Sequence, residues 1–266
     1  MVSKQRIIAV TVMLFYTICL FCSCSYKTES KQPKSGSQKD IEPDEDWNVK
    51  GNIVYFGKKE VHNIESKKTS DGWFDMSVVD VDTVYVAYFS DVDGTISVDK
   101  TYDGGETWMT SCISYKKYAG IGAVYISFFN RKQGYIFYCS DPGAGLENEI
   151  LFFTDDGAET FYMKEDLSDK IENYVTDMAF LNKDKGIILV SYHGTDVYAY
   201  QTKNGGKEWK SLEVTEWKGG DYINGISIEK NRNVDSWTLC LQMVTDDRKI
   251  RESYISKDDW KTWLKE

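Results

Sequence analysis

An eight-residue pattern that occurs four times constrains the fold of this chain more than any other feature. The copies are residues 101–108 (TYDGGETW), 154–161 (TDDGAETF), 202–209 (TKNGGKEW) and 256–263 (SKDDWKTW). Self-similarity with a period of roughly 50 residues is typical of solenoids and propellers, in which each repeat is one supersecondary unit. The strands of the chain are therefore assigned relative to these octets.

The residue types of the octet suit a tight turn between two strands. An Asp or Asn side chain accepts hydrogen bonds from backbone N–H groups in the turn, and glycine supplies a positive φ. The closing aromatic residue would anchor the turn, because burying an indole removes about 150–250 Å² from water, an upper bound of about 4–6 kcal/mol. We predict a structural and not a catalytic role for the octet residues. They are Thr101, Asp103, Gly105, Thr107, Trp108, Asp156, Phe161, Asn204, Gly206, Trp209, Asp258 and Trp263.

The octet closely resembles the Asp box, or BNR repeat, Ser/Thr-x-Asp-x-Gly-x-Thr-Trp, found in sialidases and in many β-propellers that are not enzymes. The first copy matches this motif at every defined position. The later copies depart from it at Ala158 and Phe161, at Asn204 and Glu208, and at Trp260, which stands where glycine belongs. Four copies in phase are a strong signal, and the resemblance implies a β-propeller.

The sequence between the octets predicts strands in a regular order. Four units, at about 73–115, 120–165, 174–215 and 221–266, each have four apparent strands, with the octet between the third and the fourth. The third unit shows this most plainly, with strands at 177–181, 186–191, 197–201 and 208–212. The 18 Tyr, 8 Trp and only 3 Pro also suit β-structure.

Two of the units can be aligned residue by residue. Residues 129–135 (FNRKQGY) and 180–187 (FLNKDKGI) share the order Phe, turn, Gly and apolar residue. That order, followed by a box, resembles the repeats of photosystem II assembly factor-like propellers as well as sialidase-type ones. We predict an all-β fold for residues 47–266, a small β-propeller of four-stranded antiparallel blades with Asp-box turns. A ring of four blades, a ring of five with a degenerate first blade built from 47–70, and an open array remain alternatives, and four or five blades are favoured.

The N-terminal residues resemble a bacterial lipoprotein signal. Lys4 and Arg6 precede an apolar run over 7–21 that is too short for a good membrane span. Cleavage after Ser23 would expose Cys24 for lipidation, so residues 1–23 are predicted to be the signal peptide. An ordinary cleaved signal and an uncleaved anchor are the alternatives. Residues 24–46 are polar and are predicted to be a flexible tether that anchors the domain to the extracytoplasmic face of a membrane.

The net charge and the cysteine content bear on nucleic-acid binding, disulfides and metal sites. The formal net charge of −10 argues against nucleic acid. Besides Cys24, the predicted mature chain has three cysteines, Cys112, Cys139 and Cys240, which permit one disulfide at most and suit buried free thiols better. The sequence contains no CxxC or Cys/His metal pattern. We therefore predict no metal site and no cofactor.

If the boxes lie on one face of the propeller, the loops joining second to third strands lie on the other. We predict that a binding site would lie on that second face. The sequence Asp91-Val92-Asp93-Gly94 lacks the Gly and Glu that an EF-hand loop needs further along, so a calcium loop of that type is rejected. The candidate binding residues of these loops are Asp91, Asp93, Asp141, Glu147, His193, Asp246 and Asp247.

Three classes of function are compatible with this sequence. The resemblance to sialidases implies three arginines that clamp the substrate carboxylate. The predicted mature chain has only Arg131, Arg232, Arg248 and Arg251, and no Arg-Ile-Pro motif. We therefore predict that the chain is not an enzyme, and that it is a tethered binding or assembly module for a protein or glycan on the cell surface. A sialidase-like glycoside hydrolase and a purely structural envelope protein are the alternatives.

Overall fold

The computed structural model describes residues 46–50, 52–64, 74–90, 94–114, 122–140, 148–171, 174–192, 196–212, 222–230, 236–245 and 248–266. Regular structure within these residues consists of β-strands alone. The strands belong to two compact units, Met1–Asn63 and Ile64–Glu266. In these described ranges there is no helix long and apolar enough to span a membrane.

The first unit contains one antiparallel sheet of three strands. These are β1 (Trp47–Lys50), β2 (Ile53–Phe56) and β3 (Lys59–Asn63), paired in that order. Gly57, with a φ of 60°, turns the chain between β2 and β3. The buried Trp47 packs against Phe56, with ring centroids 5.1 Å apart. Three paired strands therefore occupy residues 47–63, within the segment 47–70 that was considered for a degenerate first blade.

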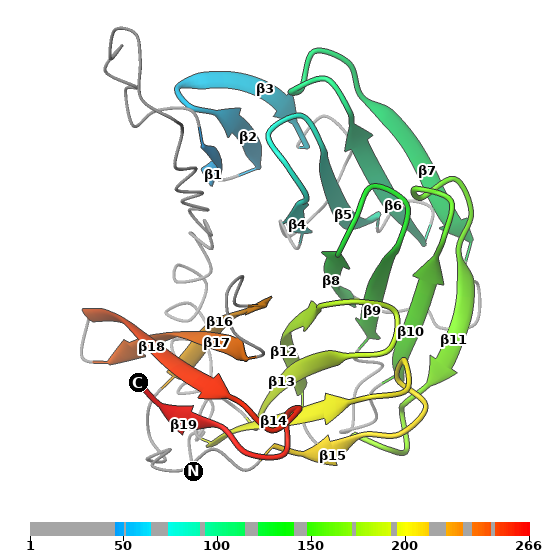
Figure 1. Ribbon diagram of the computed structural model, residues 1–266. Helices are drawn as coiled ribbons and strands as arrows, with labels where there is room; N and C mark the ends of the chain where they lie inside the picture. Colours follow the sequence, from blue (N-terminus) through cyan, green and yellow to red (C-terminus); the bar gives the residue numbers. More distant parts are fainter. Residues whose placement is uncertain are drawn as a thin grey trace, which may run out of the picture. The chain divides into compact units, whose positions relative to one another are not determined.

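The second unit contains four antiparallel sheets of four strands, each in chain order (Figure 1). The first sheet contains β4 (Phe74–Val78), β5 (Val84–Ser90), β6 (Thr95–Thr101) and β7 (Met109–Ser114). The second contains β8 (Gly122–Phe128), β9 (Gly134–Ser140), β10 (Asn148–Thr154) and β11 (Tyr162–Asp166). The third contains β12 (Tyr174–Phe180), β13 (Gly186–Tyr192), β14 (Asp196–Thr202) and β15 (Lys210–Ser211). The fourth contains β16 (Tyr222–Lys230), β17 (Trp237–Thr245), β18 (Arg248–Ser256) and β19 (Leu264–Lys265).

Each octet lies between the third and fourth strands of its sheet, as predicted. With the three-stranded sheet of the first unit, the described residues form five sheets. The predicted fold class, a small all-β propeller of antiparallel blades with Asp-box turns, is confirmed.

Alternating side chains fill the spaces between consecutive sheets of the second unit. On β8, Val124, Ile126 and Phe128 are buried in a cluster shared with β5 and β6, whereas Ala123 and Tyr125 pack against the cluster shared with the third sheet. A third cluster joins the third and fourth sheets. The period-2 alternation of a strand thus gives each inner strand one face for each neighbouring sheet.

The alignment of the second and third units needs a correction of one residue. Phe128, and not Phe129, pairs with Gly134, just as Phe180 pairs with Gly186. A Cβ at Gly134 or Gly186 would lie 2.5 Å from a ring atom of the paired phenylalanine. Glycine is therefore needed at both positions because the paired phenylalanine ring occupies the space that a Cβ would take. The register of the strands decides which phenylalanine this is, and two adjacent phenylalanines left the sequence ambiguous.

The cysteines of the second unit are free thiols. Cys139 and Cys240 are buried, as predicted, but Cys112 is exposed on the outermost strand β7. The expectation of burial was wrong for Cys112 because an outermost strand has one neighbouring strand only, and its outward side chains remain in contact with solvent.

Candidate functional site

The Asp-box side chains form hydrogen bonds within their own turns. Asp103 accepts hydrogen bonds from the Thr107 N–H at 2.9 Å and the Thr107 hydroxyl at 2.6 Å. The Thr101 hydroxyl donates to Asp103 at 2.8 Å and accepts from the Gly105 N–H at 2.9 Å. These hydrogen bonds, led by the Thr107 hydroxyl, lower the pKa of Asp103 to about 2. The carboxylate is therefore ionised at neutral pH and accepts these hydrogen bonds.

The other boxes repeat this arrangement with one difference. Asp156 accepts the Thr160 hydroxyl and Asp258 the Thr262 hydroxyl, at 2.6 and 2.7 Å. Asn204 accepts the Glu208 N–H at 3.0 Å, and the third box has no hydroxyl at that place because Glu208 replaces threonine. The turn geometry is the same in all four boxes, since the fourth and fifth residues have positive φ in each. These pairs are Gly104 and Gly105, Gly157 and Ala158, Gly205 and Gly206, and Asp259 and Trp260.

Backbone hydrogen bonds attach the first three boxes to the turn between the first two strands of the same sheet. The N–H groups of Gly104, Gly157 and Gly205 donate to the carbonyls of Asp82, Lys132 and Asp184, at 3.1, 2.8 and 2.9 Å. Boxes and first turns therefore lie at the same end of their sheets. The loops joining second to third strands lie at the other end, as antiparallel pairing requires.

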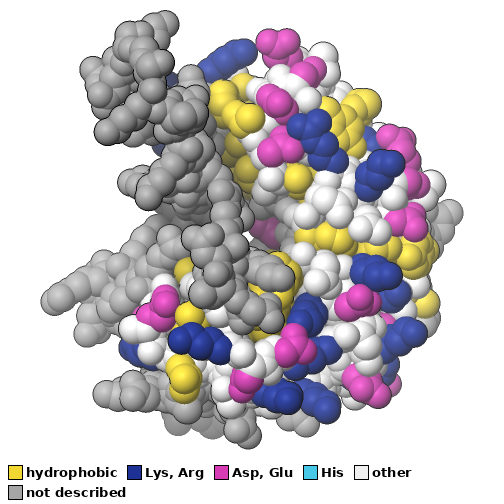
Figure 2. Space-filling view, in the orientation of Figure 1, with side chains coloured by type: hydrophobic (Ala, Val, Ile, Leu, Met, Phe, Trp, Pro, Cys, Tyr) yellow, Lys and Arg dark blue, Asp and Glu magenta, His cyan; other side chains and the backbone are white. Residues whose placement is uncertain are grey.

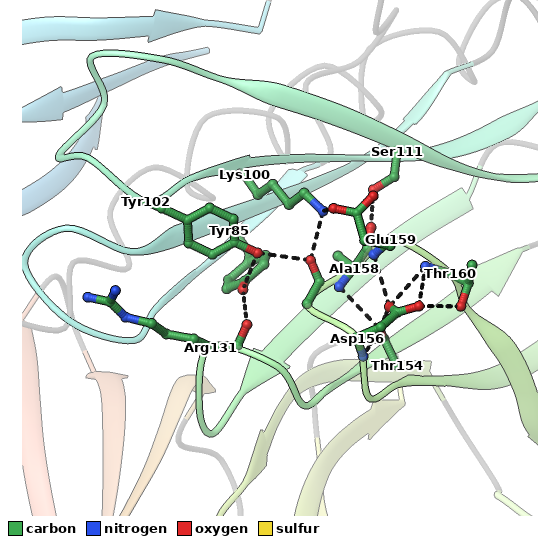
Figure 3. A network of polar contacts seen from close by, with 11 residues as sticks. Tyr85, Lys100, Tyr102, Ser111, Arg131, Thr154, Asp156, Ala158, Glu159 and Thr160 are labelled. Carbon is green, nitrogen blue, oxygen red and sulfur yellow. Dashed lines mark hydrogen bonds and ion pairs between the residues drawn. The ribbon is translucent and has the colours of Figure 1, made fainter.

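The second box also contacts the first sheet (Figure 3). The buried Lys100 Nζ donates to the Gly157 carbonyl at 2.8 Å and to Glu159 Oε1 at 2.5 Å. The Ser111 hydroxyl donates to the Ala158 carbonyl, and the Tyr102 hydroxyl to the Gly157 carbonyl. The polar groups of this box are thus used to join two sheets.

The first strands of the first and third sheets each carry a carboxylate that bonds to the next sheet, a feature that the sequence did not lead us to predict. Asp75 on β4 accepts the N–H of Met76 at 2.8 Å and, across the sheet junction, the N–H of Ile126 at 2.8 Å. Asp177 on β12 accepts the N–H of Met178 at 2.7 Å and that of Ile226, in the fourth sheet, at 2.8 Å. Each carboxylate therefore caps a backbone N–H on the inner edge of the next sheet. The shared Asp-Met pair in the first strand of the two units was the available signal.

Asp75 differs from the box carboxylates Asp103 and Asp156 in its electrostatic environment. Burial raises the pKa of Asp75 to about 6, although the hydrogen bonds from Ile126 and Met76 oppose this shift. A carboxyl group with a raised pKa is the type that serves as a general acid in glycosidases. Both oxygens of Asp75 already accept backbone hydrogen bonds, so the geometry in hand assigns it a role in joining strands.

The sequence-predicted binding residues lie outside the described residues. In the sequence, Cys24 precedes the first described residue, and the others fall between the second and third strands of their sheets: Asp91, Asp93, Asp141, Glu147, His193, Asp246 and Asp247. Among the residues that are described, no three His, Cys, Asp or Glu side chains are grouped so as to hold a metal ion. Acidic and basic side chains are intermixed on the surface seen in Figure 2, without a large area of one sign.

Comparison with solved structures identifies the fold. No protein-family model and no curated protein sequence matches the chain. The Hadza microbial sialidase Hz136 has a TM-score of 0.54 and 11% sequence identity, over 80% of this chain and 52% of that protein. The fold is a β-propeller, similar to that of this sialidase. At this identity the similarity concerns the fold alone.

Two further structures are similar at lower scores. YCF48 bound to D1 peptide has a TM-score of 0.41 and 14% identity, over 71% of this chain and 66% of its own. The Trypanosoma rangeli sialidase in complex with sialic acid has a TM-score of 0.47 and 14% identity, over 74% of this chain and 39% of its own. This propeller therefore spans less than two thirds of the length of each of the three proteins.

The prediction that the chain is not an enzyme is wrong. The fold is similar to that of Hz136, which is a sialidase. A shortage of arginines excludes only an active site built on three of them, and glycosidases of other types need two carboxylates. Arg131 itself pairs with Asp80 at 2.9 and 3.1 Å on the box side of the second sheet. Catalysis is therefore compatible with this fold.

Proposed function

We propose that this protein is a lipid-anchored, extracytoplasmic β-propeller that binds a protein or glycan partner through the loops joining second to third strands. The observation that carries this proposal is that polar groups at the end of the sheets where the boxes lie already form hydrogen bonds within the protein. The box side chains form hydrogen bonds within their own turns, the first three boxes also bond to the first turns of their sheets, and the second box bonds to the first sheet as well. The opposite ends of the sheets carry the loops with the candidate residues, and loops on a rigid scaffold are common binding elements.

The similarity to Hz136 suggests the first ligand to test. That protein is a sialidase, so a sialylated glycan is the ligand with which its fold is associated. A protein partner is the other candidate, because the loops of a propeller also offer a broad surface for association. The loop over residues 141–147 is the longest candidate loop and contains Asp141 and Glu147.

The test compares two altered proteins with the unaltered chain. In the first, residues 141–147 are replaced by a short Gly-Ser turn; in the second, Lys132, which is exposed on the box side, is changed to Ala. Glycan-array binding and photo-cross-linking to envelope proteins are measured for all three. We expect the loop replacement to abolish the signal and Lys132→Ala to retain it. Equal loss in both variants, or a signal that survives loop replacement, contradicts the proposed binding face. A fluorogenic sialoside assay, run on the same three proteins, measures turnover separately from binding.

The lipid anchor is tested on the full chain. The sequence Leu20-Phe21-Cys22-Ser23-Cys24 supports it, since Ser23 is the small residue that such a site needs before the lipidated cysteine. Labelling with a clickable palmitate is expected to disappear in Cys24→Ala and to persist in Cys22→Ala. Labelling that survives in Cys24→Ala contradicts the assignment.

A further inference from the structure

The boxes of the first two sheets and those of the last two differ in charge. The Asp-box motif leaves its second and sixth residues undefined, so the turn does not depend on these side chains. The sixth residues of the four boxes are Glu106, Glu159, Lys207 and Lys261. The second residues are Tyr102, Asp155, Lys203 and Lys257. The charged side chains at both positions are exposed, acidic in the first two sheets and basic in the last two.

The residues around the boxes share this difference. The box side of a sheet consists of its first turn, its box and the residue after the box. In the first two sheets these segments are 79–83, 101–109, 129–133 and 154–162, and they contain seven acidic and two basic residues. In the last two sheets they are 181–185, 202–210 and 256–264, with seven lysines and four acidic residues. The first turn of the fourth sheet, 231–235, lies outside the described residues.

These two sets are called the acidic half and the basic half of the box side, because each contains both signs with an excess of one. They belong to one side of the second unit, since neighbouring box ends are in contact. Lys100 bonds to the second box, and the Tyr135 hydroxyl donates to the Lys183 carbonyl, in the first turn of the third sheet, at 2.7 Å. Lys185, in the same turn, pairs with Asp259 of the fourth box. The two halves therefore lie side by side and meet between the second and third sheets.

Exposed apolar side chains lie on the box side as well. Among the described residues, the large hydrophobic side chains that are exposed are Val81, Met109, Tyr162, Met163 and Leu264, with exposed fractions of 44–56%. Val81 belongs to a first turn, and the other four are the first or second residue after a box. Aromatic and methionine side chains are enriched in protein interfaces. The box side thus combines apolar side chains with charges, as a protein interface does.

Charge complementarity selects the partner for this surface. An anionic lipid surface or an acidic protein would attract the basic half and would be repelled by the acidic half, which has the larger excess of charge. A second copy of the chain has both halves. In a two-fold arrangement the same surface of each copy forms the contact, so each acidic half lies against the basic half of the other copy.

We propose that the box side of this protein pairs with the box side of a second copy to form a two-fold dimer. The ends of the sheets where the second strands finish and the third begin lie away from this contact in both copies. The dimer therefore leaves those ends accessible to a ligand. This inference goes beyond the proposed function, and it requires neither the lipid anchor nor a particular ligand.

Sedimentation equilibrium of the full chain in a mild detergent tests the proposal. We expect a dimer whose dissociation constant rises by about tenfold between about 50 and about 500 mM NaCl, because salt screens exposed charges. A chain that is monomeric at every accessible concentration would overturn the proposal, and so would a dimer that does not respond to salt.

Two triple variants each reverse the excess charge of one half. The first combines Asp82→Lys, Glu106→Lys and Asp155→Lys, and the second combines Lys207→Glu, Lys210→Glu and Lys257→Glu. All six side chains are exposed, so both variants are expected to fold, which thermal unfolding checks. Each variant alone places like charges opposite one another and should raise the dissociation constant by at least about 30-fold. A dissociation constant that neither variant changes would contradict the assigned contact.

Mixing the two variants distinguishes the proposed contact from a general effect of charge. One variant then has an excess of basic residues in both halves and the other an excess of acidic residues, so we expect a heterodimer at least about tenfold tighter than either variant alone. Asp169→Lys, exposed beyond the far end of β11, is the matched control and should leave the dissociation constant unchanged. A mixture that stays monomeric would overturn the proposal. A monomer that binds phosphatidylglycerol vesicles through Lys207 and Lys257 would overturn it in favour of a lipid surface.

Discussion

Changing Gly186 to Ala tests why glycine stands at the start of the second strands. Either a side chain would not fit there, or the backbone needs the conformational freedom of glycine. A Cβ at Gly186 would lie 2.5 Å from two ring atoms of Phe180. The ring has little room to withdraw, because it stacks on Tyr135 at 3.9 Å and meets Trp209 edge-on at 6.2 Å. A methyl group at this place therefore displaces a ring that belongs to a sheet junction.

Two opposing terms set the size of the effect. Overpacking a core by one methyl group costs about 1–3 kcal/mol. Replacing Gly by Ala also restricts the unfolded chain and returns about 0.4–1 kcal/mol where the backbone accepts alanine. The net expectation is a loss of about 1–2 kcal/mol, or a Tm lower by about 2–8 °C for a domain of this size.

The assay is reversible thermal or urea unfolding of Gly186→Ala, with Gly134→Ala as a matched variant that meets Phe128 in the same way. The double variant Gly186→Ala with Phe180→Leu provides the control, since a smaller side chain leaves room for the methyl group. Its destabilisation should be less than the sum of the two single changes. A neutral or stabilising Gly186→Ala, or strict additivity in the double variant, would refute the steric reasoning.

Three further outcomes follow from the structure. The folded-state pKa of Asp75 is raised to about 6, so its contribution to stability is complete below the pKa it has in the unfolded chain and is lost as pH rises through 6. Asp75→Asn should remove this pH dependence from the free energy of unfolding measured between pH 4 and 7. An unchanged pH dependence in the variant would exclude Asp75 as its source. The pKa of Asp103 is lowered to about 2, so its contribution to stability is present above the pKa it has in the unfolded chain and is lost as pH falls towards 2. Asp103→Asn should reduce the loss of stability at acid pH. The same loss of stability at acid pH in the variant would show that the box carboxylate is not coupled to folding. The exposed Cys112 should react with a maleimide in the folded protein, whereas the buried Cys139 and Cys240 should react only after denaturation; peptide mapping that finds Cys139 or Cys240 labelled first would contradict the burial pattern.

The sequence predicted the fold to a useful depth because the octets carry local information. Turn chemistry at Asp103 and Gly105 depends on residues a few positions apart, and strand alternation has a period of two, so both can be recognised without tertiary structure. Four strands per unit and the place of the boxes between the third and fourth strands followed from these local signals. The alignment erred by one residue at Phe129 because adjacent phenylalanines satisfy the same pattern equally well.

The functional interpretation was weaker because it depended on counting residue types. Too few arginines for one kind of active site led to the prediction that the chain is not an enzyme, and the similarity of its fold to that of a sialidase contradicts this prediction. The inner carboxylates Asp75 and Asp177 were missed because each pairs with a backbone N–H of the next sheet. The shared Asp-Met pair marks both positions in the sequence, but it does not identify a partner that lies about 50 positions away.

What the sequence by itself determined is the repeat, the turn and the class of fold, since each follows from hydrogen bonds and side-chain alternation within a few residues. What only the tertiary structure decided is how neighbouring sheets are joined. Trp260 looked from the sequence like a defect in the last box, and the structure places its indole in the core between the third and fourth sheets. A substitution that breaks a local rule can be compensated by burial against another sheet, and burial depends on the packing of the whole unit.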